Sequence, residues 1–116
     1  MDIANVLLVD TESHADAGRM ANALETAREA VEADVGVEII FDGAGTRWVG
    51  ELAKPRHKHH KLYRRLLPYV QVCDYCARAF GVLDQVGAAG VGRLSEHRCH
   101  PSLFARLRRG AAVLTL

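Results

Sequence analysis

The sequence predicts a three-layer α/β/α domain built on a mostly parallel sheet of five strands. Short apolar runs alternate along the chain with stretches whose apolar residues recur at helical spacing. Such alternation is typical of parallel strands joined by helical crossovers, with helices on the faces of the sheet. The length of 116 residues suits one domain and suffices to bury a core without disulfide or metal staples. We therefore expect residues 1–116 to fold as a single domain.

The chain begins with the pattern of a strand, a helix and a second strand. The apolar run at residues 3–9 predicts a buried first strand. Apolar residues then recur at helical spacing across residues 20–31, which predicts an amphipathic helix capped by Ser13 or Asp16. Apolar side chains at every second position of residues 35–41 alternate with side chains that are polar or face the other side of the sheet, which predicts the second strand.

A glycine-rich turn and two helices are expected next. The stretch DGAGT at residues 42–46 is interpreted as a plain turn, because it has neither a Walker lysine nor GxGxxG spacing. Thr46 is expected to cap a short helix through residues 48–52, which Pro55 stops. The run RHKHHKLYRRLL at residues 56–67 predicts a basic helix.

The third and fourth strands are predicted in the second half of the chain. A short strand at residues 69–73 is followed by a helix at residues 74–80 that Gly81 closes. Residues 83–89 add one or two helical turns, and residues 91–94 form the fourth strand.

The C-terminal segment predicts the last helix and the fifth strand. In HPSLFARLRRG, Pro101 suits the first helical turn and Gly110 suits the stop, while Leu103 and Leu107 share one face. The final AAVLTL, residues 111–116, has the composition of a strand.

Charge is distributed unevenly along the chain although the total is only +1. Residues 1–50 contain ten acidic and three basic side chains, a balance of −7, and the remainder contains twelve basic and four acidic ones, a balance of +8. Such asymmetry can indicate an acidic partner or nucleic acid. The simpler interpretation, which we favour, is that the two halves attract each other within the chain or across an oligomer contact.

The cellular setting is inferred from the first residues and the cysteines. MDIANVLLVD lacks a basic leader, and no apolar run reaches the roughly 18 residues of a membrane span, so we expect an unsecreted protein that makes no membrane contact. Three cysteines are an odd number without the spacing of a disulfide framework. We therefore expect a reducing, cytoplasmic setting in which the cysteines are chemical rather than structural.

The chemistry is expected at one edge of the sheet. Ligands of open parallel α/β sheets bind beyond the carboxyl ends of the strands. Four such ends are predicted at residues 10–13, 42–46, 73–76 and 96–100, so their reactive side chains should converge. The candidates for ligand or anion binding at this edge include Asp10, Asp42, Gly43 and Gly45.

The pair Cys73 and Cys76 in VCDYCARAFGV has four interpretations. It can be a redox pair, half of a metal site, a sulfur-carrying nucleophile, or two small residues that fit the core. Cys73 is predicted at the junction of strand and helix, where free backbone N–H groups favour a thiolate, whereas Asp74 beside it acts in the opposite direction.

Histidines and a third cysteine extend the list of candidates. His100 is placed either to cap the last helix or to act at the site. Cys99 and His97 lie beside it, so Cys73, Cys76, Cys99 and a histidine form a minority zinc hypothesis. His57 and His60 are spaced to share one face of a helix. The two histidines can either be exposed to solvent or contact a ligand or anion near the active edge.

The basic segment at residues 54–65 is the best candidate for binding RNA or an acidic protein. It has no interleaved aromatic platform, which weakens the RNA interpretation, and we do not expect nucleic acid as a partner.

The succession NVLLVD, EIIFDGAGTRW, HKHHKLY, VCDYCARAFGV, CHPS and RRGAAVLTL resembles the DsrE/DsrF-like proteins, in particular a small single-domain branch. The resemblance spans nearly the whole chain. It implies a flavodoxin-like α/β/α fold with a parallel five-stranded sheet and assembly into dimers, trimers or hexamers. Better-known members relay sulfur through a cysteine at the end of the third strand, which bears a persulfide.

The resemblance assigns roles to individual residues. Cys73 matches the persulfide-bearing cysteine, with Gly81 at the expected distance after it, and Cys76 matches a second cysteine of this branch. His57, His60 and the turn at residues 100–102 resemble branch features without an assigned role. Cys99 departs from the pattern, which implies a small residue such as glycine before His100, and this departure weakens a zinc site built on Cys99.

The leading hypothesis is a cytoplasmic, homo-oligomeric sulfur carrier or sulfurtransferase-like protein. Cys73 would bear the persulfide, Cys76 would be a resolving or assisting thiol, and His100 a proton donor or anion contact. It would take sulfur from a donor protein and pass it to an acceptor protein, without a cofactor. One alternative is a metal- or ligand-binding module that uses Cys73, Cys76 and histidines from His57, His60 and His100. Another is a non-catalytic oligomeric scaffold with buried cysteines.

Overall fold

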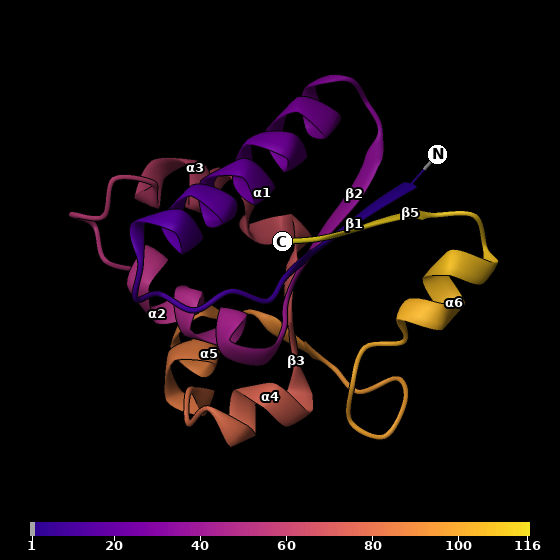
Figure 1. Cartoon of the computed structure of the whole chain (residues 1–116). Helices are drawn as coiled ribbons and strands as arrows, with labels where there is room; N and C mark the ends of the chain where they lie inside the picture. Colours follow the sequence, from indigo (N-terminus) through magenta and orange to yellow (C-terminus); the bar gives the residue numbers. More distant parts are fainter. Residues whose placement is uncertain (1) are drawn as a thin grey trace.

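The computed structural model describes residues 2–116, which form one five-stranded sheet with helices on both faces (Figure 1). All paired strands are parallel, and their order in the sheet is β4-β3-β2-β1-β5. The strands are β1 (Asp2–Leu7), β2 (Gly36–Phe41), β3 (Val70–Cys73), β4 (Gly92–Leu94) and β5 (Ala112–Thr115). The predicted three-layer α/β/α class is confirmed, and the sheet is parallel throughout.

The helices connect successive strands. They are α1 (His14–Glu32), α2 (Trp48–Leu52), α3 (His60–Leu66), α4 (Asp74–Ala79), α5 (Leu83–Ala89) and α6 (Leu103–Arg108), with short 3-10 helices η1 (Gly43–Arg47) and η2 (Leu67–Tyr69). Among the described residues, no helix combines the length and the apolar character needed to cross a membrane.

The two faces of the sheet are covered unequally. The larger core cluster includes side chains from β1, β2 and β3 together with α1 to α5, among them Leu24, Ile39 and Val72. On the opposite face α6 packs alone, over a small cluster of buried residues around Val6 and Ile40 (Figure 1). Five helices therefore form one outer layer, and a single two-turn helix forms the other.

Helix α1 begins where the sequence predicts. Ser13 is its cap, because the Ser13 hydroxyl accepts a hydrogen bond from the Asp16 N–H at 3.1 Å. Asp16, the other predicted cap, lies in the first turn and pairs with Arg19. The helix buries Met20 and Leu24 and leaves its charged residues in solvent.

The segment at residues 42–46 is a short 3-10 helix rather than a plain turn. Asp42 caps it by accepting the Gly43 N–H at 2.8 Å, and the Thr46 hydroxyl donates to the Gly43 carbonyl. The prediction that Thr46 caps the following helix is wrong, because its hydroxyl is used inside η1 and α2 has no side-chain cap.

The predicted basic helix at residues 56–67 is shorter than expected. Turns occupy the chain after α2, and α3 begins only at His60. In these turns the ring nitrogen of His57 accepts the His59 N–H at 3.1 Å, a local bond that replaces helical bonding. Tyr63 and Leu66 are buried, whereas the basic side chains of the segment are exposed.

The last helix also differs from the prediction. Ser102, rather than His100, caps α6, since its hydroxyl accepts the Ala105 N–H, and Pro101 precedes the helix. Leu107 does not share the inward face with Leu103, because Leu107 is 58% exposed. The buried position one turn after Leu103 is taken by Arg106.

The acidic and basic halves of the sequence meet at one place. Glu38 of β2 forms ion pairs with Arg106 and Arg109. Within residues 2–116, the other ion pairs join side chains of the same half. The expected attraction between the halves within the chain therefore depends on Glu38.

Candidate functional site

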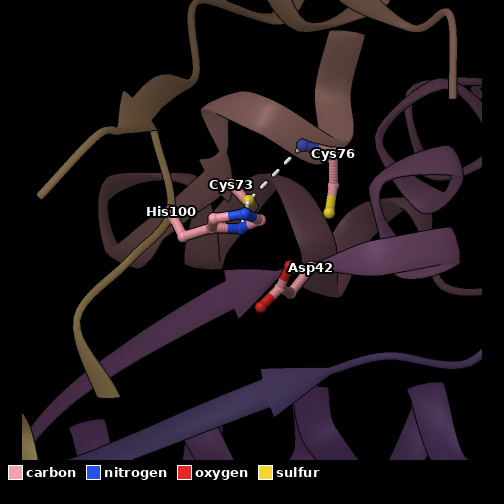
Figure 2. Close-up of side chains that lie close together, drawn as sticks. All are labelled: Asp42, Cys73, Cys76 and His100. Carbon is pink, nitrogen blue, oxygen red and sulfur yellow. Dashed lines mark hydrogen bonds between the residues drawn. The ribbon is translucent and has the colours of Figure 1, made fainter. Parts of the chain in front are cut away.

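Four side chains converge at the carboxyl edge of the sheet (Figure 2). They are Asp42 after β2, Cys73 at the end of β3, Cys76 in α4, and His100 in the loop after β4. One ligand atom from each lies within 4.8 Å of one atom from every other. We refer to these four residues as the edge cluster.

Cys73 is the buried member of the edge cluster. It caps α4, and its sulfur accepts the Cys76 N–H at 3.4 Å. The sulfur also lies 3.3 Å from Nδ1 of His100 and 3.8 Å from the Cys99 carbonyl oxygen, to which the thiol donates. Burial raises the pKa of the Cys73 thiol to about 12, and the nearby Asp42 carboxylate also raises it. In the metal-free protein Cys73 is therefore a neutral thiol at physiological pH.

Cys76 lies one helical turn after Cys73 and is partly exposed. Its side chain points toward Asp42 (Figure 2). Burial raises the pKa of the Cys76 thiol, and Asp42 adds to the rise. All three cysteines of the chain are free thiols, and Cys99 is exposed.

His100 reaches the cluster from a tight turn. The backbone groups of His97 and His100 bond to each other at 2.8 and 2.9 Å, and Arg98 and Cys99 between them both have positive φ angles, of 48° and 67°. The His100 ring packs on Tyr75 with 4.7 Å between ring centroids. The turn is also held by the Tyr75 N–H, which donates to the Cys99 carbonyl at 2.8 Å.

Asp42 and the two glycines after it are held by β1. The Asp42 N–H donates to the Leu7 carbonyl, and η1 crosses the end of β1 so closely that a Cβ on Gly45 would lie 1.9 Å from the Leu7 oxygen. Gly43 has a φ of +55°. Gly45 therefore serves a close approach of backbone to backbone and Gly43 a left-handed conformation, which explains both glycines without a ligand.

Asp10 does not join the edge cluster. Its carboxylate pairs with Arg47 at 2.9 Å and accepts the Thr11 N–H at 2.7 Å. The Thr11 bond and Arg47 together hold the pKa of Asp10 below its usual value. Asp10 thus ties the loop after β1 to η1.

His57 and His60 also lie outside the edge cluster, so the minority zinc set that included them is not assembled. The His57 ring packs edge-on against Trp48, and burial lowers the pKa of His57. Nδ1 of His60 lies 2.7 Å from the Leu52 carbonyl oxygen, to which it donates. Both histidines pack the segment between α2 and α3 onto the domain.

Three residues around the site were not predicted from the sequence. Tyr75 packs on His100, and Glu96 and Arg106 hold the loop that carries it. For Arg106, the sequence contains one signal, which is its spacing. It lies one helical turn after Leu103, so both side chains should face the sheet. Nothing in the sequence indicates the partners of these side chains, which come from distant segments.

The donor atoms of the edge cluster fit a borderline-soft metal ion. Two sulfurs, one imidazole nitrogen and one carboxylate oxygen form a ligand set typical of zinc, whereas magnesium and calcium prefer oxygen alone. The same two sulfurs, three residues apart, can also undergo thiol chemistry. The geometry therefore supports metal binding and thiol chemistry as candidate activities.

Comparison with known proteins identifies a similar fold. No family model matches the sequence, and no curated protein matches it. The solved structure of BT1422, a conserved protein of unknown function from Bacteroides thetaiotaomicron, is similar with a TM-score of 0.67 and 15% sequence identity. The match covers 99% of this chain and 94% of that protein. At this identity the likeness establishes a shared fold.

Proposed function

We propose that the protein is a metal-binding module that holds a zinc-type divalent ion with Asp42, Cys73, Cys76 and His100. The observation that carries the proposal is the mutual approach of the four ligand atoms to within 4.8 Å. Zinc bonds of about 2.0–2.3 Å at tetrahedral angles place ligand atoms roughly 3.5 Å apart. The Cys73 sulfur and Nδ1 of His100, at 3.3 Å, are already near that spacing.

The surroundings of the cluster support the same assignment. Burial of a thiol close to a carboxylate disfavours a thiolate, and a bound divalent cation would reverse this effect by supplying the missing positive charge. The Cys76 N–H on the Cys73 sulfur and the Gly43 N–H on Asp42 are outer contacts that orient ligands. With four protein ligands, coordination would be complete, which is typical of structural or storage sites rather than catalytic ones.

Metal analysis of the protein, purified without a histidine tag, tests this proposal. We expect one equivalent of zinc, with affinity measured by competition against a chromophoric chelator. Cys73→Ser and Cys76→Ser should each lower that affinity by more than about 100-fold, beyond the 10- to 100-fold typical of outer-contact residues. Cys99→Ser is the matched control, because Cys99 is exposed and contributes no side-chain ligand to the cluster. Failure of the wild-type protein to bind zinc, cobalt or iron stoichiometrically would refute the proposal.

Sulfur carriage on Cys73 is the second candidate function, and it agrees with the resemblance to DsrE/DsrF-like proteins. It is favoured by two contacts of the Cys73 sulfur, one with the Cys76 N–H, which donates to it, and one with Nδ1 of His100 at 3.3 Å. The complete burial of Cys73 and its raised pKa count against it, because the attacking species in sulfur transfer is the thiolate.

Intact mass measurement decides between the two candidates. Metal-free protein is incubated with a small-molecule persulfide donor, and sulfur carriage predicts one added sulfur atom that is absent in Cys73→Ser and retained in Cys99→Ser. Metal binding without sulfur carriage predicts that any added sulfur is retained in Cys73→Ser, because Cys99 is exposed and Cys76 is partly exposed, whereas Cys73 is buried.

A further inference from the structure

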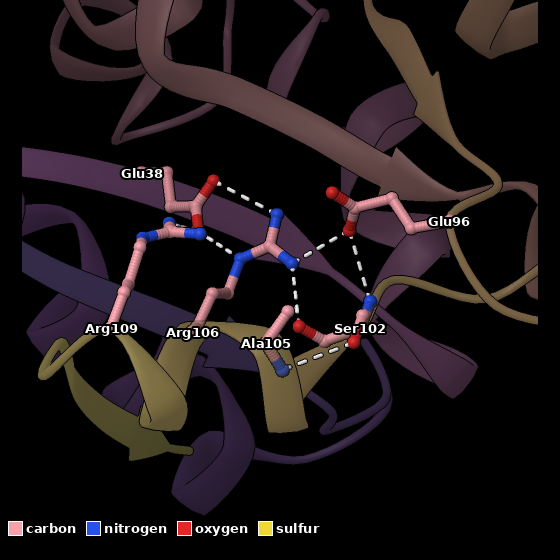
Figure 3. A network of polar contacts seen from close by, with 6 residues as sticks. All are labelled: Glu38, Glu96, Ser102, Ala105, Arg106 and Arg109. Atoms are coloured by element: carbon pink, nitrogen blue, oxygen red, sulfur yellow. Dashed lines mark hydrogen bonds and ion pairs between the residues drawn. The ribbon is translucent and has the colours of Figure 1, made fainter.

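The loop that carries His100 is closed at its base by one side chain (Figure 3). Glu96 begins this loop and Ser102 ends it. The Arg106 guanidinium donates to the Glu96 carboxylate at 2.6 Å and to the Ser102 carbonyl at 2.8 Å. The same Glu96 oxygen accepts the Ser102 N–H at 2.9 Å. Both ends of residues 96–102 are therefore bonded to each other and to Arg106.

Arg106 is itself anchored to the sheet. It is only 3% exposed, and its other nitrogens pair with both carboxylate oxygens of Glu38. Such bidentate, charge-assisted hydrogen bonds between arginine and a carboxylate are strong, and they also fix the relative orientation of the two groups. Glu38 lies on β2 four residues before Asp42. The Arg106 guanidinium therefore links the loop that carries His100 to the strand after which Asp42, another member of the edge cluster, follows.

The turn inside this loop requires such support. Arg98 and Cys99 both adopt left-handed conformations, which residues other than glycine rarely do. Conformations of this kind persist where the surrounding structure holds them. The His100 ring contacts the Cys73 sulfur and the Tyr75 ring, and the His100 carbonyl accepts the Glu96 and His97 N–H groups at 2.9 Å. At the base of the loop, the side-chain bonds are those of Arg106 to Glu96 and Ser102.

We infer that Arg106 and Glu96 are positioning residues of the edge cluster, which hold His100 at the distance a metal ligand requires. This inference rests on the proposed metal binding. Neither residue contributes a ligand atom to the cluster, so both act through the loop that carries His100. Their removal should weaken metal binding to the extent that His100 contributes to it.

Glu96→Ala is the better test variant. Arg106→Met would leave Glu38 facing an apolar side chain and endanger folding, whereas Glu96→Ala keeps the Arg106–Glu38 pair and removes a side chain that is 41% exposed. Glu51→Ala is the matched control, since Glu51 is 42% exposed and ion-paired with Lys54 away from the edge cluster. Zinc affinity is measured for each variant in the wild-type background and in the His100→Ala background.

We expect Glu96→Ala to lower zinc affinity by about 10- to 100-fold in the wild-type background, the usual range for residues that orient ligands. In the His100→Ala background the same change should lower it less than about threefold, because the ligand that Glu96 positions is gone. Cobalt-substituted Glu96→Ala should show the weakened ligand-field absorption of a displaced nitrogen ligand. Glu51→Ala should match its parent in both backgrounds.

Two results would overturn the inference alone: an unchanged zinc affinity in Glu96→Ala, or an equal loss in both backgrounds, which indicates a general effect on folding. Absence of zinc binding by the wild-type protein would instead remove the proposed function, and the inference with it.

Discussion

Cys99 occupies a backbone conformation that few residues other than glycine tolerate. Its φ is 67°, in the left-handed region, and its side chain is exposed while its carbonyl is bonded to the Tyr75 N–H. The backbone of Cys99 therefore supports the site, whereas its thiol makes no contribution to the edge cluster. The observed φ supplies a physical reason for glycine at this position.

Replacing Cys99 by glycine should stabilise the metal-free protein. The left-handed conformation costs about 1–2 kcal/mol for a residue with a Cβ, and glycine's extra freedom in the unfolded chain returns about 0.5–1 kcal/mol of this. We expect a net gain of about 0.5–1 kcal/mol in urea unfolding for Cys99→Gly. Cys99→Ser, which keeps the Cβ, should remain within about 0.5 kcal/mol of wild type. A Cys99→Gly protein less stable than Cys99→Ser would contradict this account of the turn.

Helix η1 is the element that places Asp42 beside the cysteines. It starts at the end of β2, and its backbone passes directly over the end of β1, where Gly45 leaves no room for a side chain. Trp48 extends the same contact, because its indole N–H donates to the Val9 carbonyl at 3.0 Å. The position of η1 is therefore set by packing against β1 rather than by its own helical bonds.

Substitution of Gly45 tests this dependence on packing. A Cβ at this position would lie 1.9 Å from the Leu7 oxygen, and backbone atoms cannot move aside as a flexible side chain can. We expect Gly45→Ala to lower the free energy of unfolding by about 3 kcal/mol, measured by urea denaturation.

Gly87→Ala is the control for this substitution. Gly87 lies within α5 and has open space around its Cβ position, so alanine should stabilise the protein by about 0.5–1 kcal/mol through helix propensity. Equal effects of the two substitutions would show that η1 can shift away from β1.

At the scale of the whole molecule, the stability of the fold depends on pH through two buried side chains, Tyr63 and Cys73. Burial disfavours the deprotonated, charged form of each. Burial raises the pKa of Tyr63 from the usual 10.0 to about 12 and that of Cys73 from 9.0 to about 12. The Tyr63 ring packs near Phe41, and its hydroxyl has no hydrogen-bond partner among the described residues. Both groups are protonated in the folded protein at pH values where the unfolded chain loses their protons.

Stability should therefore fall as the pH rises above about 9. Between the unfolded and folded pKa values the folded state binds more protons, so each of the two groups lowers the free energy of unfolding by about 1.4 kcal/mol per pH unit. Tyr63→Phe should remove the tyrosine part of this loss between pH 10 and 11. At pH 7 it should be neutral or stabilising by about 1 kcal/mol, because it deletes an unpaired hydroxyl. Urea midpoints of metal-free protein across pH 7–11 measure both effects, and an equally steep decline in Tyr63→Phe would contradict the assigned burial.

The sequence by itself determined the fold class and the edge of the sheet at which the candidate site lies. Apolar periodicity is a local property, so the order of strands and helices could be read directly, and parallel strands bring their carboxyl ends to one edge. Asp42, Cys73 and Cys76 follow such ends, and His100 closes the loop after β4. Their proximity was therefore predictable in outline from sequence.

Only the tertiary structure decided which polar side chains meet there. Asp10 follows a strand end as Asp42 does, yet Arg47 pairs with it, and His60 bonds to a carbonyl of α2 instead of reaching the site. Arg106 rather than Leu107 is buried on the inward face of α6, where Glu38 of β2 offers it a partner. A polar side chain becomes buried where a distant partner satisfies it, and the spacing of residues along the chain carries no information about that partner.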